Sequence, residues 1–154
     1  MHLHFSWIGL IVFLLPLPFT LLYMLFPPND SPASAAPPLK LVTLLEQSSR
    51  ILLAASLCLF TDKHNPDFGH CFFYCALIFF LMYNLVWLRY FVQGRQIFLL
   101  SKPFLKLPLP LAILPVFYFL FASLWLKNYI AFGFALLFGV MHCLLSYLTF
   151  YNKP

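Results

Sequence analysis

The sequence predicts an all-α fold: an integral membrane helical bundle of five transmembrane helices, with the N-terminus outside and the C-terminus cytoplasmic. Three observations predict it. Of the 154 residues, 63% are hydrophobic and 8% are charged, whereas soluble domains contain about 25% charged residues. Five apolar stretches are separated by polar connections. Lys and Arg are concentrated in alternate connections, as in multi-pass proteins of a cell membrane.

Each predicted span approaches the roughly 20 apolar residues that cross a hydrocarbon core. The spans cover about 5–26, 39–60, 71–88, 107–126 and 129–150. The connections between them are the polar segments 27–38, 61–70 and 89–106 and the short pair Lys127-Asn128. Because no stretch is left for a separate soluble domain, residues 1–154 are expected to form a single transmembrane domain solvated by the lipid bilayer.

The span at 39–60 differs from the others because Glu46 and Arg50 lie inside it. Residues 51–60 alone are too few to cross a bilayer. We therefore expect a full helix that includes the charged residues, since a helix satisfies its own backbone hydrogen bonds in lipid. A re-entrant segment is the alternative.

Pro16 and Pro18 fall in the middle of the first predicted span, and Pro115 falls inside the fourth, after Pro108 and Pro110. Each lacks a backbone N–H and so leaves a carbonyl without its helical partner. Kinks are expected at these positions. They would shape a cavity or a hinge, or be ordinary features of membrane helices whose neighbours satisfy the backbone.

The positions of the cations predict the orientation. Six lie in the connections on one side of the predicted bundle: Lys40, Arg89, Arg95, Lys102, Lys106 and Lys153. Only Lys63 and Lys127 lie on the other side. Since cytoplasmic loops carry an excess of Lys and Arg, the side with six cations is expected to be cytoplasmic.

Polar side chains within the spans predict the position of a site, because ionisable groups at membrane depth are costly and usually face the bundle interior. The predicted ligand-binding cluster consists of Glu46, Arg50, Asn84, His142, Ser146 and Tyr147. At a rise of about 1.5 Å per residue, Arg50 and His142 both lie about 15 Å from the ends of their helices. The cluster would bind a ligand, or it would only neutralise charge and fix the register of the helices.

Small residues in the last span predict how it packs. Ala131, Ala135 and Gly139 recur every four residues, which would let another helix approach closely. His142 and Ser146 continue this stripe toward the cytoplasmic end. The packed face of the helix is therefore expected to carry the histidine.

A second group of side chains lies near the predicted outer surface. His70, Cys71 and Cys75 are candidate ligands for a soft metal ion, with Cys58 at similar depth. A disulfide between these cysteines is possible where conditions oxidise, and small apolar cysteines in a helix are the simpler interpretation. No cofactor is implied by any motif. Trp87 and Trp125 are interpreted as anchors at the membrane interfaces.

Four short segments carry a resemblance to a known group of proteins. They are LLEQSSR at 44–50, WLRYF at 87–91, LAILP at 111–115 and GVMHCLLSY at 139–147. Their order resembles that in an unnamed family of short polytopic bacterial membrane proteins with no assigned activity. The resemblance implies several membrane helices and a bacterial inner membrane, and it implies no chemistry.

Three functional hypotheses follow. A binder or carrier of a small anionic or protonatable solute would use Arg50 for the anion and His142 or Glu46 for a proton. Transporters usually contain internal repeats; none is visible here, so a homodimer would have to supply the second half. A membrane enzyme would use the same residues on a lipidic substrate. An accessory subunit would bind a larger membrane complex. Nucleic acid is excluded as a partner because no basic run could follow its backbone.

Overall fold

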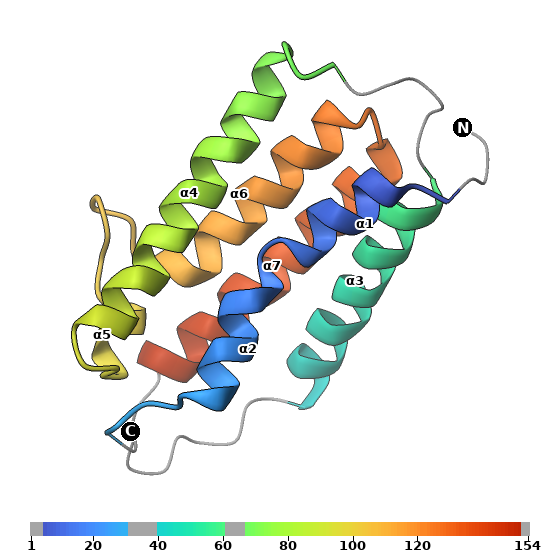
Figure 1. Ribbon diagram of the computed structural model, residues 1–154. Coiled ribbons are helices and arrows are strands. Elements are labelled where there is room, and N and C mark those ends of the chain that lie inside the picture. The colour runs from blue at the N-terminus through green and yellow to red at the C-terminus, as the bar shows by residue number, and fades with distance from the viewer. Residues whose placement is uncertain (1–4, 31–39, 61–66, 152–154) are drawn as a thin grey trace.

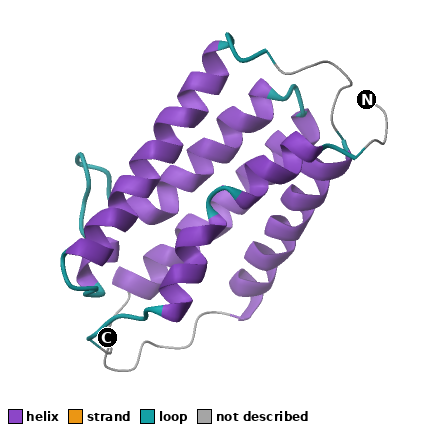
Figure 2. Cartoon of the chain, in the orientation of Figure 1, coloured by secondary structure: helices purple, strands orange, loops and turns teal. Residues whose placement is uncertain are grey.

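The computed structural model describes residues 5–30, 40–60 and 67–151, and these residues form helices and no strand (Figures 1 and 2). The helices are α1 (Trp7–Leu14), α2 (Leu17–Leu25), α3 (Lys40–Leu59), α4 (Cys71–Val92), α5 (Phe98–Ser101), α6 (Pro110–Trp125) and α7 (Tyr129–Tyr151). α6 packs between α4 and α7, α7 packs against α3, and α1 packs on α3 and α6.

Four helical segments are long and apolar enough to cross a membrane: Trp7–Leu25, Lys40–Leu59, Cys71–Val92 and Tyr129–Thr149. α6 is apolar but has only 16 residues, and it begins at Pro110 rather than at the predicted 107. Before α6 the chain makes a tight turn, in which Phe104 and Leu107 exchange backbone hydrogen bonds and Leu109 has a φ of 49°. Proline then suits the first turn of the helix, where its missing N–H costs nothing.

The end of α4 also differs from the prediction. The helix continues past residue 88 to Val92 and includes Arg89 in its last turn. The Arg89 guanidinium donates hydrogen bonds to the carbonyl oxygens of Leu99, at 2.7 Å, and Lys102, at 3.0 Å. Because these carbonyls satisfy the cation, the charge does not end the helix, which stops instead just before Gly94 with its φ of +90°.

The prolines of the first span have different effects. Pro16 separates α1 from α2, as its expected kink implies, and Pro18 lies in the first turn of α2. Pro16 has no N–H to donate to the carbonyl of Val12, and the Tyr118 hydroxyl donates to that oxygen instead at 2.8 Å. A side chain of α6 thus supplies the hydrogen bond that the Val12 carbonyl lacks at the break. Pro115 lies within α6, which continues through it.

One face of α3 packs on α7. The buried residues of α3 recur every three or four positions: Glu46, Ser49, Leu53, Ser56 and Leu57. On α7, Ala131 and Ala135 are fully buried. A Cβ atom added at Gly139 would lie 2.5 Å from Cγ1 of Val116. The small-residue stripe of α7 therefore does allow another helix, α6, to approach closely.

The helices are held close together near the connection between α6 and α7. A Cβ atom added at Gly9 of α1 would lie only 1.9 Å from the carbonyl oxygen of Leu57 on α3. Asn128 is fully buried; its Oδ1 accepts a hydrogen bond from the Ala131 N–H at 2.9 Å, and its Nδ2 donates to the Ser56 carbonyl at 2.8 Å. Asn128 therefore caps α7 and ties it to α3.

At the opposite end, the segment after α2 contacts the segment after α4. Asn29 Nδ2 donates to the Gly94 carbonyl at 3.0 Å, and Arg95 Nη2 donates to Asn29 Oδ1 at 3.1 Å. The Ile97 N–H donates to Asp30 Oδ1 at 2.8 Å. We call this set the Asn29–Arg95 contacts. They hold the end of α2 close to α4.

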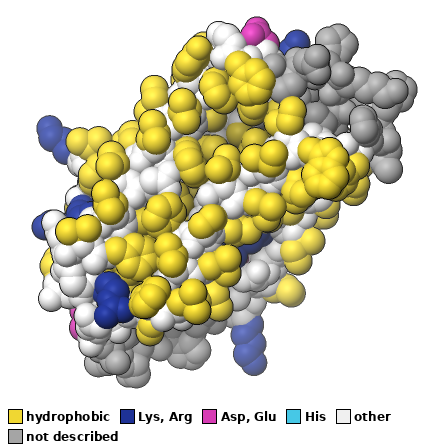
Figure 3. Space-filling model, viewed as in Figure 1, with side chains coloured by type: hydrophobic (Ala, Val, Ile, Leu, Met, Phe, Trp, Pro, Cys, Tyr) yellow, Lys and Arg dark blue, Asp and Glu magenta, His cyan; other side chains and the backbone are white. Residues whose placement is uncertain are grey.

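The surface agrees with a lipid environment. In Figure 3, hydrophobic side chains cover most of the visible face, and most of the Lys and Arg side chains in view lie in the half of the molecule where α2 ends. Two of the cations counted for the orientation, Lys63 and Lys153, lie outside the described residues.

Candidate functional site

Glu46 is buried between α3 and α7. It belongs to the face of α3 that packs on α7, six residues after the helix begins, and its side chain is 1% exposed. Arg50 follows one turn later, so acid and base meet on the same side of the helix. Its side chain is 39% exposed. The helix thus buries the carboxylate and leaves the guanidinium accessible.

One oxygen of the Glu46 carboxylate has two partners. The guanidinium of Arg50 donates a hydrogen bond to Oε1, and Nδ1 of His142 on α7 lies 3.1 Å from the same oxygen. The other oxygen, Oε2, is buried and has no hydrogen-bond partner among the described residues. Three of the predicted site residues therefore form one connected cluster between two helices that lie 96 positions apart in sequence at this contact.

Phe138 positions the two basic groups of the cluster. The Arg50 guanidinium lies 5.6 Å from the centre of the Phe138 ring. The His142 imidazole is stacked on the same ring, with centroids 5.0 Å apart and planes 20° apart. A cation over an aromatic face is stabilised by the ring quadrupole. Phe138 is itself buried, so it forms a fixed platform beneath both groups.

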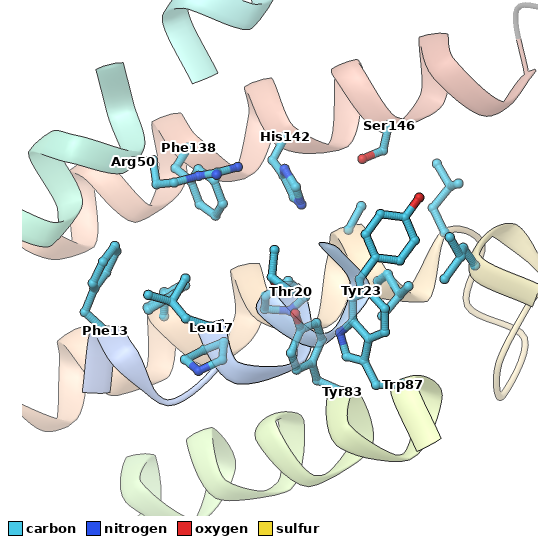
Figure 4. A pocket seen from close by; sticks show the side chains of 17 residues that line it. Phe13, Leu17, Thr20, Tyr23, Arg50, Tyr83, Trp87, Phe138, His142 and Ser146 are labelled. Atoms are coloured by element: carbon cyan, nitrogen blue, oxygen red, sulfur yellow. The ribbon is translucent and has the colours of Figure 1, made fainter. Parts of the chain in front are cut away.

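Arg50 and His142 line a cavity of about 280 Å³. Figure 4 shows the labelled side chains of Arg50, Phe138, His142 and Ser146 along one wall. Most of the other lining residues are apolar or aromatic: Phe13, Pro16, Leu17, Thr20, Tyr23, Tyr83, Trp87, Leu100, Leu109, Leu111, Ala112, Pro115 and Phe119. Size and lining suit a small ligand, because ligand pockets are mainly apolar with a few polar groups that fix orientation.

The wall opposite the charged cluster was not predicted. Tyr23 of α2 and Tyr83 and Trp87 of α4 line it, and the Tyr83 hydroxyl interacts with Thr20 (Figure 4). Trp87 was expected to anchor the interface but is only 6% exposed, with Phe19 stacked on it. The spacing of Tyr83, Trp87 and Tyr90 along one helix face was the available signal.

Two predicted site residues lie away from the cavity. Asn84 Nδ2 donates to the Phe80 carbonyl of its own helix at 2.9 Å, and its Oδ1 is buried without a partner among the described residues. α4 packs on α6 rather than on α3 or α7, which keeps Asn84 from the cluster. Tyr147 is half exposed and does not line the cavity, whereas Ser146 does.

The candidate metal ligands lie at the start of α4. His70 precedes α4, and its Nδ1 accepts a hydrogen bond from the Phe72 N–H at 3.4 Å, which caps the helix. Cys71 Sγ lies 3.8 Å from the same nitrogen. Cys75 does not complete a set, because no group of three or more His, Cys, Asp or Glu within the described ranges could hold a metal ion. All four cysteines, including Cys58, are free thiols.

Comparison with protein-family models, curated proteins and solved structures finds no match to this chain. The chemistry of the site must therefore be inferred from its residues. If Glu46 is ionised, a proton on Nδ1 of His142 would point to Oε1, and Nε2 would then be the ring nitrogen left to contact a ligand.

Proposed function

We propose that the protein binds or carries a small anionic solute in the cavity beside Arg50, with His142 and Glu46 as the groups that exchange a proton. The observation that supports this is the Arg50 side chain, which is 39% exposed and lines a cavity ten residues into an apolar helix. An arginine at such depth is costly unless it has a partner. Glu46 binds one side of the guanidinium, and the other side faces the cavity, where an anion can bind.

Ligand-dependent stability tests the proposal. The protein in lipid nanodiscs is heated with sodium acetate, benzoate, phosphate or sulfate, at the ionic strength of a sodium chloride control. A ligand present at 100 times its Kd adds about 2.7 kcal/mol of stability. We expect at least one anion to raise the Tm of the wild type.

The paired variant Glu46→Gln/Arg50→Met removes both charges together, which keeps the cavity wall without an isolated charge. We expect it to show no anion-dependent rise. Lys106→Met, which removes an exposed cation that does not line the cavity, should respond as the wild type does. The proposal fails if no anion in the panel stabilises the protein, or if the paired variant responds equally.

In the same proposal the chain crosses the membrane five times, with the N-terminus outside. α6 is the shortest of the five and rises about 24 Å, and 10 of its 16 residues are buried by its neighbours. On a cysteine-free background, restored Cys71 should react with a membrane-impermeant maleimide in intact cells. A Lys102→Cys variant should react only after permeabilisation. The reverse pattern would invert the topology.

A membrane enzyme is the second candidate, favoured by one observation. A carboxylate orients the histidine, and Ser146 lies one turn further along the same helix in the same cavity. This order of groups is that of a serine hydrolase. However, no hydrogen bond joins Ser146 to His142 in the described structure. Covalent labelling of Ser146 by a fluorophosphonate would favour the enzyme, and absence of labelling would favour the binder.

An accessory role in a homodimer or larger membrane complex ranks after these. Two features would support it, the small-residue stripe and the basic loop at 89–106, and the stripe packs within the chain, where Ala131, Ala135 and Gly139 are buried. Co-purification of a second membrane protein at fixed stoichiometry would support this role.

A further inference from the structure

The charges of the cluster limit the charge of its ligand. Glu46 carries one negative charge and Arg50 one positive charge, so the cluster is neutral when His142 is neutral. An anion that binds to it leaves an uncompensated charge in an apolar cavity, which is costly. A proton on His142 compensates a single negative charge. Phosphate carries about −1.5 to −2 at neutral pH and exceeds what this cluster can neutralise.

Among the described residues, other titratable groups face His142 from the surrounding helices, and none of them supplies a further fixed charge. α3 contributes Glu46 and Arg50, α2 contributes Tyr23, and α4 contributes Tyr83. The cavity residues of α6 are not ionisable. The proton that balances a bound anion is therefore assigned to the imidazole.

The rest of the cavity indicates the body of the ligand. Beyond the charged cluster, the wall presents the rings of Tyr23, Tyr83 and Trp87 (Figure 4). A cavity of about 150 Å³ lined by apolar side chains holds one benzene, so about 280 Å³ has room for a body of one to two rings. A strongly hydrated inorganic anion would lose much of its water shell among these rings, which offer far fewer hydrogen bonds than water does.

We propose that the cavity binds a small hydrophobic monocarboxylate with an aromatic body and takes up one proton for each molecule bound. The carboxylate contacts Arg50, whose planar fork matches it, and His142. The ring lies among Tyr23, Tyr83 and Trp87. This inference rests on the proposed function, because it names the class of anion for the same site.

The proton balance holds for both routes of entry. A carboxylate from water binds together with one proton from water, which adds to Nε2 of His142. A neutral acid that enters from the lipid transfers its own proton to the same nitrogen and becomes the carboxylate. α2, which lines the cavity and has no buried residue, is the element past which such an acid would enter. In each case the proton leaves with the ligand.

Quenching of Trp87 tests the class of ligand. In a Trp7→Phe/Trp125→Phe variant Trp87 is the only tryptophan, and the heavy bromine of 4-bromobenzoate quenches it on contact. 4-Bromobenzamide has nearly the same shape without the charge. We expect the acid to reach half-quenching at a concentration at least about tenfold lower than the amide does. This factor corresponds to about 1.4 kcal/mol of binding free energy from recognition of the charge. Empty nanodiscs with a free tryptophan analogue correct for quencher dissolved in lipid.

Calorimetry of the wild type tests the proton without any substitution. Titration of 4-bromobenzoate in two buffers of different ionisation enthalpy should give an uptake of about one proton at pH values where His142 starts neutral. Over the same range the Kd should rise about tenfold per pH unit. His142→Gln should bind the acid more weakly, with no proton uptake and no such pH dependence. Uptake that persists in this variant would overturn the assignment to His142.

The outcomes separate the two proposals. Equal quenching by the acid and the amide would overturn the monocarboxylate inference. If inorganic phosphate competes with 4-bromobenzoate, and this competition requires Arg50, the monocarboxylate inference would also be overturned. The proposal of an anion site would still stand. If no anion stabilises the protein and 4-bromobenzoate does not quench Trp87, both proposals fall together.

Discussion

The two halves of the first span have similar apolar sequences and different surroundings. α1 is packed closely: Gly9 and Val12 are buried, and the backbone of α1 meets α3. α2 continues the same stretch, yet none of its residues is buried. Its rings at Phe19 and Tyr23 contact Trp87 at one edge of the cavity. Apolarity therefore determines that a segment lies in lipid, whereas small side chains and hydrogen-bond partners determine whether it packs.

The largest effect is expected at the closest contact of α1. In Gly9→Ala the new Cβ would overlap the Leu57 carbonyl oxygen, which belongs to backbone and cannot move aside. We expect a loss of at least about 3 kcal/mol in the free energy of unfolding, at the upper end of overpacking effects. Unfolding by sodium dodecyl sulfate in mixed micelles measures it.

Gly133→Ala is the matched control for this substitution. It is the same chemical change in a helix, and a Cβ atom there meets nothing within 4 Å. It should be neutral or stabilise by up to about 1 kcal/mol, since alanine favours the helix. Equal effects of the two variants would show that α1 is packed no more tightly than an exposed face.

The next effect is expected where the cavity begins, at the charged pair. Arg50→Met leaves the Glu46 carboxylate buried with only His142 beside it, and removing one partner of a buried pair costs about 3–5 kcal/mol. We expect about 3 kcal/mol, because His142 compensates in part. Glu46→Gln should cost less, since the Arg50 that remains is accessible.

The paired variant Glu46→Gln/Arg50→Met should recover to within about 1 kcal/mol of the wild type. The three variants are compared by thermal unfolding in detergent. If Arg50→Met is as stable as the wild type, the Arg50 cation gives no net stability to the fold. That result would favour a role for Arg50 in binding a ligand.

The contact between Glu46 and His142 was largely predictable, and the cavity was not. Ionisable residues inside apolar spans are few, so Glu46, Arg50 and His142 stood out from the sequence. Asn84 stood out for the same reason, but which helices are neighbours depends on packing that the sequence pattern does not specify. Tyr83 and Trp87 were not recognised as cavity residues, because aromatic residues also occur at membrane interfaces.

Boundaries of the helices were predictable only where local chemistry ends them. α4 passed its predicted end because distant carbonyls satisfy Arg89, a partner that its own sequence neighbourhood does not reveal. The break at Pro16 was predictable from the missing N–H, whereas the hydroxyl of Tyr118 that satisfies the break was not.

A smaller effect is expected at two asparagines that look alike in sequence, Asn128, which is fully buried, and Asn84, which is half-buried. Asn128→Ala removes the cap of α7 and the bond to the Ser56 carbonyl, and we expect a loss of about 2 kcal/mol. Asn84→Ala removes only a bond to the carbonyl of its own helix and an unpartnered buried oxygen. It should change stability by less than about 0.5 kcal/mol. Chemical unfolding of both variants checks the difference.

Among the hydrogen bonds that join different segments, the smallest effect on stability is expected at the Asn29–Arg95 contacts, which are exposed. Asn29→Ala should lower global stability by less than about 1 kcal/mol, since exposed polar contacts contribute little. Because α2 has no buried residue, these contacts and its aromatic rings are what hold it over the cavity. Hydrogen exchange of the α2 amides should therefore accelerate while exchange in α1 stays unchanged. Equal acceleration in both helices would mean that the first span opens as one unit, and that its two halves do not differ in the way proposed.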